Sequence, residues 1–267
     1  MADPPGVERF GRAVWRDGVL AAAGERVLAA EVPVALVHDA STTAVMMATP
    51  ADLHDFGVGF SLTEGVIEDP GQIRALEVVE TPLGIEVRMW LEPGAGATLG
   101  DRRRRLAGPT GCGLCGIDSL EEAAHPPRLV TADLSLSPAQ IQAALQALAG
   151  EQALNALTRA VHAAGFWTPD AGLAAAREDV GRHNALDKLA GALALAGTQA
   201  PGAVVLTSRI SVEMVQKTAA IGAPILIAVS APTALAVRTA QAAGITLVGV
   251  ARDDGFEVFT RPERVAP

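Results

Sequence analysis

Residues 203–251 read AVVLTSRISVEMVQKTAAIGAPILIAVSAPTALAVRTAQAAGITLVGVA, and apolar runs alternate in them with amphipathic segments. Three runs are continuous and apolar and are predicted as buried strands: residues 203–207, 225–230 and 246–251. The segments between them have helical spacing: residues 211–220 and 233–243. Continuous apolar strands separated by helices predict an α/β fold, in which helices cover both faces of a mainly parallel sheet.

The neighbouring segments extend this pattern. Residues 161–167 are predicted as a strand, residues 182–196 as a helix, and residues 256–260 as a final edge strand. Upstream, Ser137-Pro138-Ala139-Gln140 is a capping box that predicts the start of another helix.

The first 100 residues or so have a different character, rich in strands with one helix. Residues 29–38 and 43–48 predict a hairpin, and residues 77–79 and 85–91 predict two more strands. Thr49 before Pro50 is predicted to cap a helix. The helix carries an apolar face at helical spacing and is expected to end at Gly65: Leu53, Phe56 and Phe60.

We therefore expect three parts. Residues 1–105 form a strand-rich α+β domain, residues 106–136 a mobile loop or linker with two cysteines, and residues 137–267 an α/β domain.

Net charge and composition exclude some classes of function. The net charge of −9 over 267 residues excludes a nucleic-acid or membrane binder that depends on bulk positive charge. No secretory signal is visible at the N-terminus, and glycines and prolines break the two long uncharged runs, residues 189–208 and 218–237. We expect a cytoplasmic protein without a membrane span, in which the two cysteines serve chemistry or metal binding.

The two cysteines lie in Gly111-Cys112-Gly113-Leu114-Cys115-Gly116. This stretch matches G-x-G-x-x-G, but no strand precedes it as a dinucleotide site requires. One C-x-x-C supplies two of the four ligands of a structural zinc site; His125 could add a third and a symmetric dimer could complete the set, although no other feature of the sequence requires zinc. The H-x-E of a zinc deaminase is missing.

Thiol chemistry is the interpretation of the cysteine pair that the surrounding residues favour. The glycines and prolines around it predict a mobile loop, which suits a thiol that visits two partners. The run Arg102-Arg103-Arg104-Arg105 would favour the thiolate, although such a run is as often a solvated turn.

A second polar cluster covers residues 178–188, EDVGRHNALDK. It is either the acidic N-terminus of a helix or a phosphate or pterin site with these donors: Arg182, His183 and Asn184.

Together these motifs resemble the formate dehydrogenase accessory sulfurtransferases, the FdhD/NarQ family. The resemblance runs in order from about residue 31 to residue 260 and rests on the cysteine motif, residues 178–188, Ser208–Met214, Ser230-Ala231-Pro232-Thr233, and Gly59-Phe60 with Glu64-Gly65. It implies a cytoplasmic homodimer with a cytidine-deaminase-like three-layer C-terminal domain. It also implies a sulfur carrier between a cysteine desulfurase and the molybdenum cofactor, bis-molybdopterin guanine dinucleotide, that formate dehydrogenase requires.

The resemblance also implies site residues. Cys112, the first cysteine, carries the persulfide, and Cys115 has a secondary catalytic role. The cofactor, for which GDP is an expected analogue, contacts one segment: Val250, Ala251, Arg252, Asp253, Asp254 and Gly255. Arg252 is the only cation of that segment and the expected phosphate partner, because ionised aspartates cannot donate hydrogen bonds. No metal ligands are predicted.

Two alternatives stay open. One is a disulfide oxidoreductase that uses both cysteines, and the other is a nucleotide-binding maturation chaperone whose cysteines hold a structural zinc between subunits.

Overall fold

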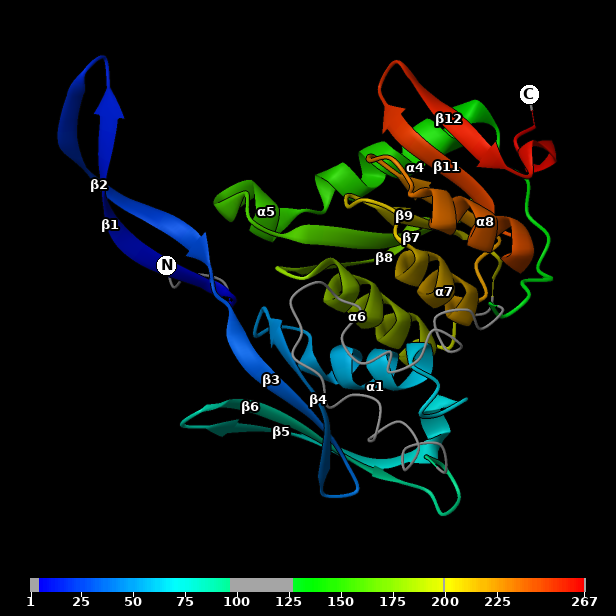
Figure 1. The fold of residues 1–267 in the computed structure, drawn as a ribbon, viewed down its shortest axis with the longest axis horizontal. Helices are drawn as coiled ribbons and strands as arrows, with labels where there is room; N and C mark the ends of the chain where they lie inside the picture. Colours follow the sequence, from blue (N-terminus) through cyan, green and yellow to red (C-terminus); the bar gives the residue numbers. More distant parts are fainter. Residues whose placement is uncertain (1–4, 97–126, 199, 267) are drawn as a thin grey trace.

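The structure, a computed structural model, describes residues 5–96, 127–198 and 200–266. A two-stranded hairpin opens the chain and extends away from the body (Figure 1): β1 (Val7–Arg16) and β2 (Val19–Ala29). Large apolar side chains on this hairpin are exposed, with Trp15 69% and Leu20 68% accessible.

A four-stranded sheet follows, in the order β4-β3-β6-β5. Its strands are β3 (Val32–His38), β4 (Ser41–Ala48), β5 (Ile73–Thr81) and β6 (Gly84–Leu91). Helix α1 (Leu53–Thr63) and the short 3-10 helix η1 (Pro70–Gln72) connect β4 to β5. The predicted apolar face of α1 is confirmed, since Leu53, Phe56 and Phe60 are buried against this sheet.

One detail of this region was predicted wrongly. The N-cap of α1 is Asp52, and its side chain makes no capping hydrogen bond. Thr49 instead makes hydrogen bonds to the C-terminal half of the molecule. Its backbone N–H donates to Asp179, and its Oγ1 accepts from Val180 N. Long-range contacts of Thr49 therefore replace the local cap that its sequence position suggested.

The second sheet has six strands in the order β12-β11-β10-β9-β7-β8. The strands are β7 (His162–Thr168), β8 (Gly172–Asp179), β9 (Ala203–Leu206), β10 (Ile225–Ala228), β11 (Thr246–Arg252) and β12 (Gly255–Thr260). The helices are α4 (Pro138–Gly150), α5 (Ala153–Thr158), α6 (Arg182–Leu195), α7 (Val212–Ile221) and α8 (Ala234–Ala243), with a 3-10 turn η2 (Pro262–Arg264).

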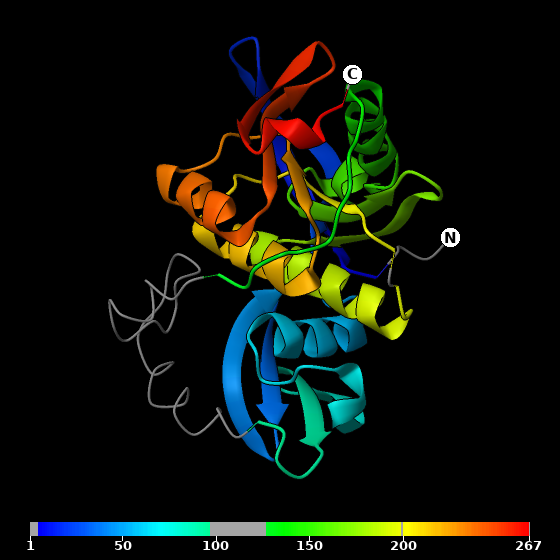
Figure 2. The same cartoon turned by 90° about the vertical axis from the view of Figure 1, so that its right-hand side faces the viewer.

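Helices cover both faces of this sheet, as predicted. Along β9, Val204 and Leu206 join the core under α6, α7 and α8, whereas Ala203 and Val205 join the core under α4 (Figures 1 and 2). The capping box that begins α4 is confirmed, because Ser137 and Gln140 exchange hydrogen bonds. The α/β class is therefore correct.

The sheet is less parallel than expected. Only the β9–β10 and β10–β11 ladders are parallel, and β7 and β12 run opposite to the other strands. β8 was not predicted; it pairs antiparallel to β7 and so runs in the direction of β9. Four strands, β8 to β11, consequently end at one edge, which we call the carboxyl edge, and α6, α7 and α8 begin there.

The described part of the predicted linker, residues 127–136, runs along this second sheet. Val130 and Leu136 are buried, and Val130 N donates to Ala243 O. None of the helices in the described part of the chain has the length and apolar character that a bilayer crossing requires.

Candidate functional site

The loops at the carboxyl edge are fixed to one another. Ile210, after β9, donates its N–H to Ala231 O at 3.3 Å and accepts at its carbonyl from Thr233 N at 3.0 Å. Ser230 O accepts from Val250 N at 3.2 Å. Backbone hydrogen bonds thus join the loops after β9 and β10 and the end of β11. Ligands of open α/β sheets bind outside such carboxyl ends.

Two helices begin at this edge without a side-chain cap. The N-cap residues of α6 and α7, Gly181 and Ser211, make no capping hydrogen bond from their side chains, whereas Thr233 caps α8. Four buried side-chain atoms next to these helix starts have no hydrogen-bond partner among the described residues: Arg182 Nε, His183 Nε2, Ser211 Oγ and Glu213 Oε2. We call these four residues the α6–α7 corner. Unpaired buried polar groups are costly and call for an explanation.

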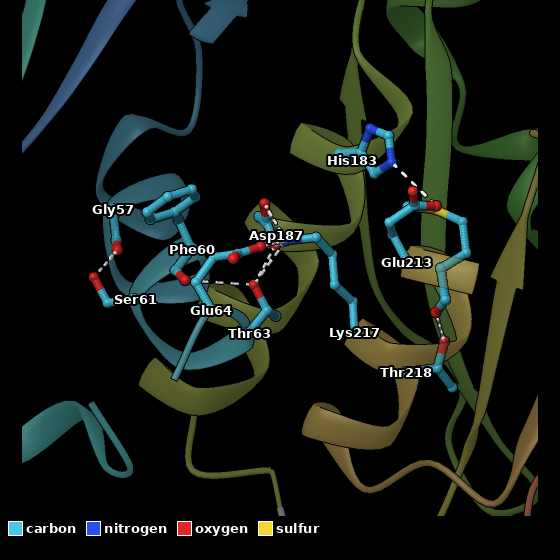
Figure 3. A network of polar contacts seen from close by, with 11 residues as sticks. Gly57, Phe60, Ser61, Thr63, Glu64, His183, Asp187, Glu213, Lys217 and Thr218 are labelled. Atoms are coloured by element: carbon cyan, nitrogen blue, oxygen red, sulfur yellow. Dashed lines mark hydrogen bonds and ion pairs between the residues drawn. The ribbon is translucent and has the colours of Figure 1, made fainter. Parts of the chain in front are cut away.

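His183 and Glu213 face each other across this corner (Figure 3). His183 is only 8% exposed, and its Nε2 lies 4.0 Å from Glu213 Oε2, which is beyond hydrogen-bonding distance. Burial raises the pKa of Glu213, but the nearby His183 ring and Ser211 hydroxyl outweigh burial and lower the pKa to about 2. Glu213 is therefore an ionised hydrogen-bond acceptor at neutral pH.

Positive charge gathers beside the corner, although the chain as a whole is acidic. Burial first, and then the charges of Arg182 and Arg209, lower the pKa of His162 at the start of β7. The two arginines come from the start of α6 and from the loop after β9, and they favour the uncharged form of His162 at the start of β7. Arg182 and Arg209 give this part of the edge its positive charge.

Most of the predicted polar cluster serves the packing of the two halves. Asp179 accepts from Thr49 N at 3.0 Å, and Lys188 Nζ lies 2.6 Å from Asp179 and donates to Thr49 O. Asn184 Nδ2 donates to Met47 O and to Asp179 Oδ1 at 2.8 and 2.9 Å. Both hydrogens of the Asn184 amide are thus engaged, so this group is not a free donor for a phosphate. Arg182 and His183 keep unpaired atoms.

A second buried network joins α1, α6 and α7 (Figure 3). Lys217 Nζ lies 2.7 Å from both Asp187 Oδ1 and Glu64 Oε1, and 3.0 Å from Thr63 Oγ1. Burial lowers the pKa of Lys217, but the carboxylates of Asp187 and Glu64 outweigh burial and raise it. This lysine therefore stays charged and holds the three helices together.

Glycines allow α1 and α6 to approach this closely. A Cβ on Gly59 would lie 1.7 Å from Asp187 O, and a Cβ on Gly191 would lie 1.9 Å from Asp55 O. Only glycine fits at such backbone contacts. Gly59 and residues 178–188, which belong to the motifs of the resemblance, therefore contact each other across the two halves.

The predicted cofactor segment is the end of β11 and the following turn. Asp253 and Asp254 form the turn to β12 and are exposed, as is Arg252. Arg252 Nη1 donates to the backbone carbonyls of Val229 and Ala251. Val250 has a φ of 51°, which is rare for a β-branched residue and marks local strain.

Arg252 and the α6–α7 corner lie at different places along the carboxyl edge. The strand order places one strand, β10, between β11, which carries Arg252, and β9, after which Ser211 and Glu213 follow. Two spacings of about 4.8 Å give roughly 10 Å between these two strands. Arg182 and His183 follow β8, which lies two strands further along the sheet.

Cys112 and Cys115, with His125 and the arginine run 102–105, lie outside the described residues. Within the described ranges, no three His, Cys, Asp or Glu side chains come together as metal ligands.

Sequence reasoning did not select Ser211, Glu213, Arg209 or His162 as site residues. Ser211, Glu213 and Arg209 lie inside a motif quoted for the resemblance, between a buried strand and a helix start. Charged residues directly after a buried strand are the signal that points to the carboxyl edge.

Comparisons with known proteins agree with this architecture. The pattern of the FdhD/NarQ family matches residues 29–266. A protein named sulfur carrier protein FdhD from Agrobacterium fabrum is 55% identical over 259 residues, covering 96% of this chain and 95% of the relative. A protein of the same name from Cupriavidus necator is 50% identical over 265 residues, covering 99% and 92%.

A solved structure from Desulfotalea psychrophila, whose description names a formate dehydrogenase accessory protein, superposes with a TM-score of 0.76 at 28% identity. It covers 98% of this chain and 100% of that one. The fold and the edge thus define a mixed α/β protein whose six-stranded sheet carries its polar loops at one carboxyl edge. The chain belongs to the FdhD/NarQ family.

Proposed function

We propose that this chain is a sulfur carrier for formate dehydrogenase maturation. It takes persulfide sulfur from a cysteine desulfurase at Cys112 and passes it to the molybdenum cofactor, bis-molybdopterin guanine dinucleotide, as its substrate. The observation that carries the proposal is family membership combined with the C-x-x-C of this chain, since relatives at 50% and 55% identity are named sulfur carriers.

The sulfur-accepting step is a thiol displacement. The Cys112 thiolate attacks the terminal sulfur of the desulfurase persulfide, the new S–S bond forms on Cys112, and the desulfurase cysteine leaves as a thiolate. The resemblance further implies a cytoplasmic homodimer. The exposed apolar side chains of the β1–β2 hairpin support a protein contact, because an isolated two-stranded hairpin is marginally stable alone.

Mass spectrometry tests the accepting step. After incubation with a cysteine desulfurase and cysteine, we expect the protein to gain about 32 Da, one sulfur atom, at Cys112. The Cys115→Ser variant should gain the same mass, because carriage needs one thiol and a disulfide cycle needs two. Sulfur found only on Cys115, or on neither cysteine, would contradict the assignment.

Nucleotide binding tests the proposed contact between the cofactor and Arg252. GDP at about 100 times its dissociation constant should stabilise the protein by about 2.7 kcal/mol, which is roughly 5–10 °C in melting temperature for a chain of this size. ADP should give a smaller shift. Arg252→Ala should reduce the GDP shift by removing a phosphate partner, while Arg74→Ala, an exposed arginine on β5, should leave it unchanged. An undiminished shift in Arg252→Ala would count against this contact.

A further inference from the structure

The β1–β2 hairpin carries an apolar face near its tip that the described part of the chain leaves exposed. Trp15 pairs with Leu20, and Ala13 pairs with Ala22, so these four side chains share one face of the hairpin. Trp15 and Leu20 are more than two-thirds exposed. Figure 1 shows the hairpin extending past α5, away from the rest of the chain. A two-stranded hairpin with such a face needs a partner to be stable.

A groove at the root of the hairpin offers a matching surface. Helix α5 and strand β8 line a cavity of about 230 Å³, which we call the α5–β8 groove. Its apolar lining includes Leu154 and Leu157 of α5 and Ala176 of β8, and Leu157 is 48% exposed. The volume lies below the roughly 300–1,000 Å³ of pockets for small-molecule ligands. Apolar side chains of another protein segment therefore fit this groove better than a free ligand.

One wall of the groove is the outer edge of a sheet. β8 stands last in the six-stranded order and pairs with β7 alone among the described strands. Its first five residues, GLAAA at positions 172–176, carry neither a charge nor a proline. Natural proteins block or cover such edges, because the unpaired N–H and C=O groups attract further strands. A hairpin laid in the groove would cover this edge.

A hairpin cannot fill the groove of its own chain. Pro5, directly before β1, lines the groove, so the groove lies at the root of the hairpin. Trp15 follows Val7 by eight strand residues, which span about 27 Å. The exposed tip is therefore held away from the groove of its own chain, and only the groove of another copy is within its reach.

Charge also favours a second copy as the partner. The hairpin, residues 7–29, holds four arginines and three carboxylates, in a chain whose net charge is −9. The groove is lined by three carboxylates and one arginine: Asp52, Glu151, Glu178 and Arg177. The weakly basic hairpin of one copy thus fits the acidic groove of another. A two-fold axis would form this contact twice, since each copy has one hairpin and one groove.

We propose that two copies of this chain exchange hairpins, so that Trp15 and Leu20 of each copy dock in the α5–β8 groove of the other. The exchange buries the apolar tip and covers the edge of β8 in both copies. The inference rests on the proposed function only for the expectation of a homodimer, and it assigns the surfaces that form it.

Sedimentation equilibrium of the full-length protein, with a reducing agent present, tests the exchange. The wild type should be a dimer. The hairpin variant Trp15→Asp/Leu20→Asp and the groove variant Leu157→Asp should each weaken the dimer about 100-fold or more, because each removes an apolar anchor from both contacts. Leu83→Asp, in the β5–β6 turn, and Leu195→Asp, at the end of α6, are the matched controls, since both leucines are more than half exposed. Both controls should dimerise as the wild type does.

Mixing the hairpin variant with the groove variant gives the sharper test. A mixed pair keeps one intact contact, in which the wild-type hairpin of the groove variant enters the wild-type groove of the hairpin variant. The mixture should therefore dimerise at least 10-fold more tightly than either variant alone. Because a misfolded variant could not regain a contact on mixing, this gain also excludes misfolding as the cause of the losses.

Three results would overturn the exchange. A monomeric wild type would remove the second copy as the partner. A dimer that is lost in the hairpin variant but kept in Leu157→Asp would place the hairpin on another surface. Two variants that are each monomeric and stay so on mixing would show that hairpin and groove do not meet. Sulfur loading at Cys112 tests the proposed function separately, because sedimentation does not depend on that thiol.

Discussion

The Cys112→Ala variant should support no detectable formate dehydrogenase activity in cells that lack the wild-type protein. Its thiolate is the proposed acceptor of the persulfide sulfur, and an alanine side chain cannot form the S–S bond. Activity of formate dehydrogenase in extracts, measured as formate-dependent dye reduction, gives the readout. We expect a loss of at least 100-fold, because a nucleophile has no partial substitute.

The same variant separates sulfur transfer from a structural role of the cysteines. If Cys112 only carries sulfur, Cys112→Ala should leave the melting temperature within about 2 °C of the wild type, since substitutions away from structural features change stability little. A structural zinc site would behave differently. Its loss would lower the melting temperature strongly, and a chelator would destabilise the wild type as well.

Cys115→Ser is the control for the redox alternative. A carrier needs Cys112 alone, so Cys115→Ser should retain a substantial part of the formate dehydrogenase activity. A disulfide oxidoreductase needs both thiols, so equal losses in Cys112→Ala and Cys115→Ser would favour that alternative.

The centre of the six-stranded sheet could be predicted because local pattern decides it. β9, β10 and β11 are continuous apolar runs, and every residue of β9 and β10 is buried. β8 escaped prediction because it is an edge strand whose residues are mostly half-buried, so neither a continuous apolar run nor a clean alternation appears in GLAAARED. The β1–β2 hairpin escaped for a related reason, since most of its β1 residues are exposed.

The polar cluster shows the limit of local reasoning about a site. Its sequence predicts a helix start with three ligand donors, but Asn184 donates to a carbonyl 137 residues away and Asp179 accepts from an amide 130 residues away. Pairing over such separations leaves no mark in the local pattern. Glu213 shows a related case, because its approach to His183, at 4.0 Å, becomes visible only once α6 and α7 are placed together.

The largest loss of stability is expected from Lys188→Met. Lys188 and Asp179 form an ion pair at 2.6 Å in which both side chains are fully buried. Lys188 Nζ also lies 5.9 Å from the centre of the Phe56 ring. Removing the lysine charge leaves the Asp179 carboxylate buried with hydrogen bonds but no counter-ion, which costs about 3–5 kcal/mol in such pairs. For a chain of this length that is a fall of roughly 6–20 °C in melting temperature.

Two comparisons isolate the buried charge as the cause. Arg88→Met removes the surface pair of Arg88 with Glu86, whose side chains are 40% and 35% exposed, and should cost no more than about 1 kcal/mol. The double variant Asp179→Asn/Lys188→Met removes both buried charges and should recover part of the loss. Urea unfolding gives the free energies. If Lys188→Met is at least as stable as Arg88→Met, the buried pair does not stabilise the contact between the two halves. If Lys188→Met is clearly less stable, the contacts that hold Thr49 against α6 also help to hold Arg182 and His183 at the carboxyl edge.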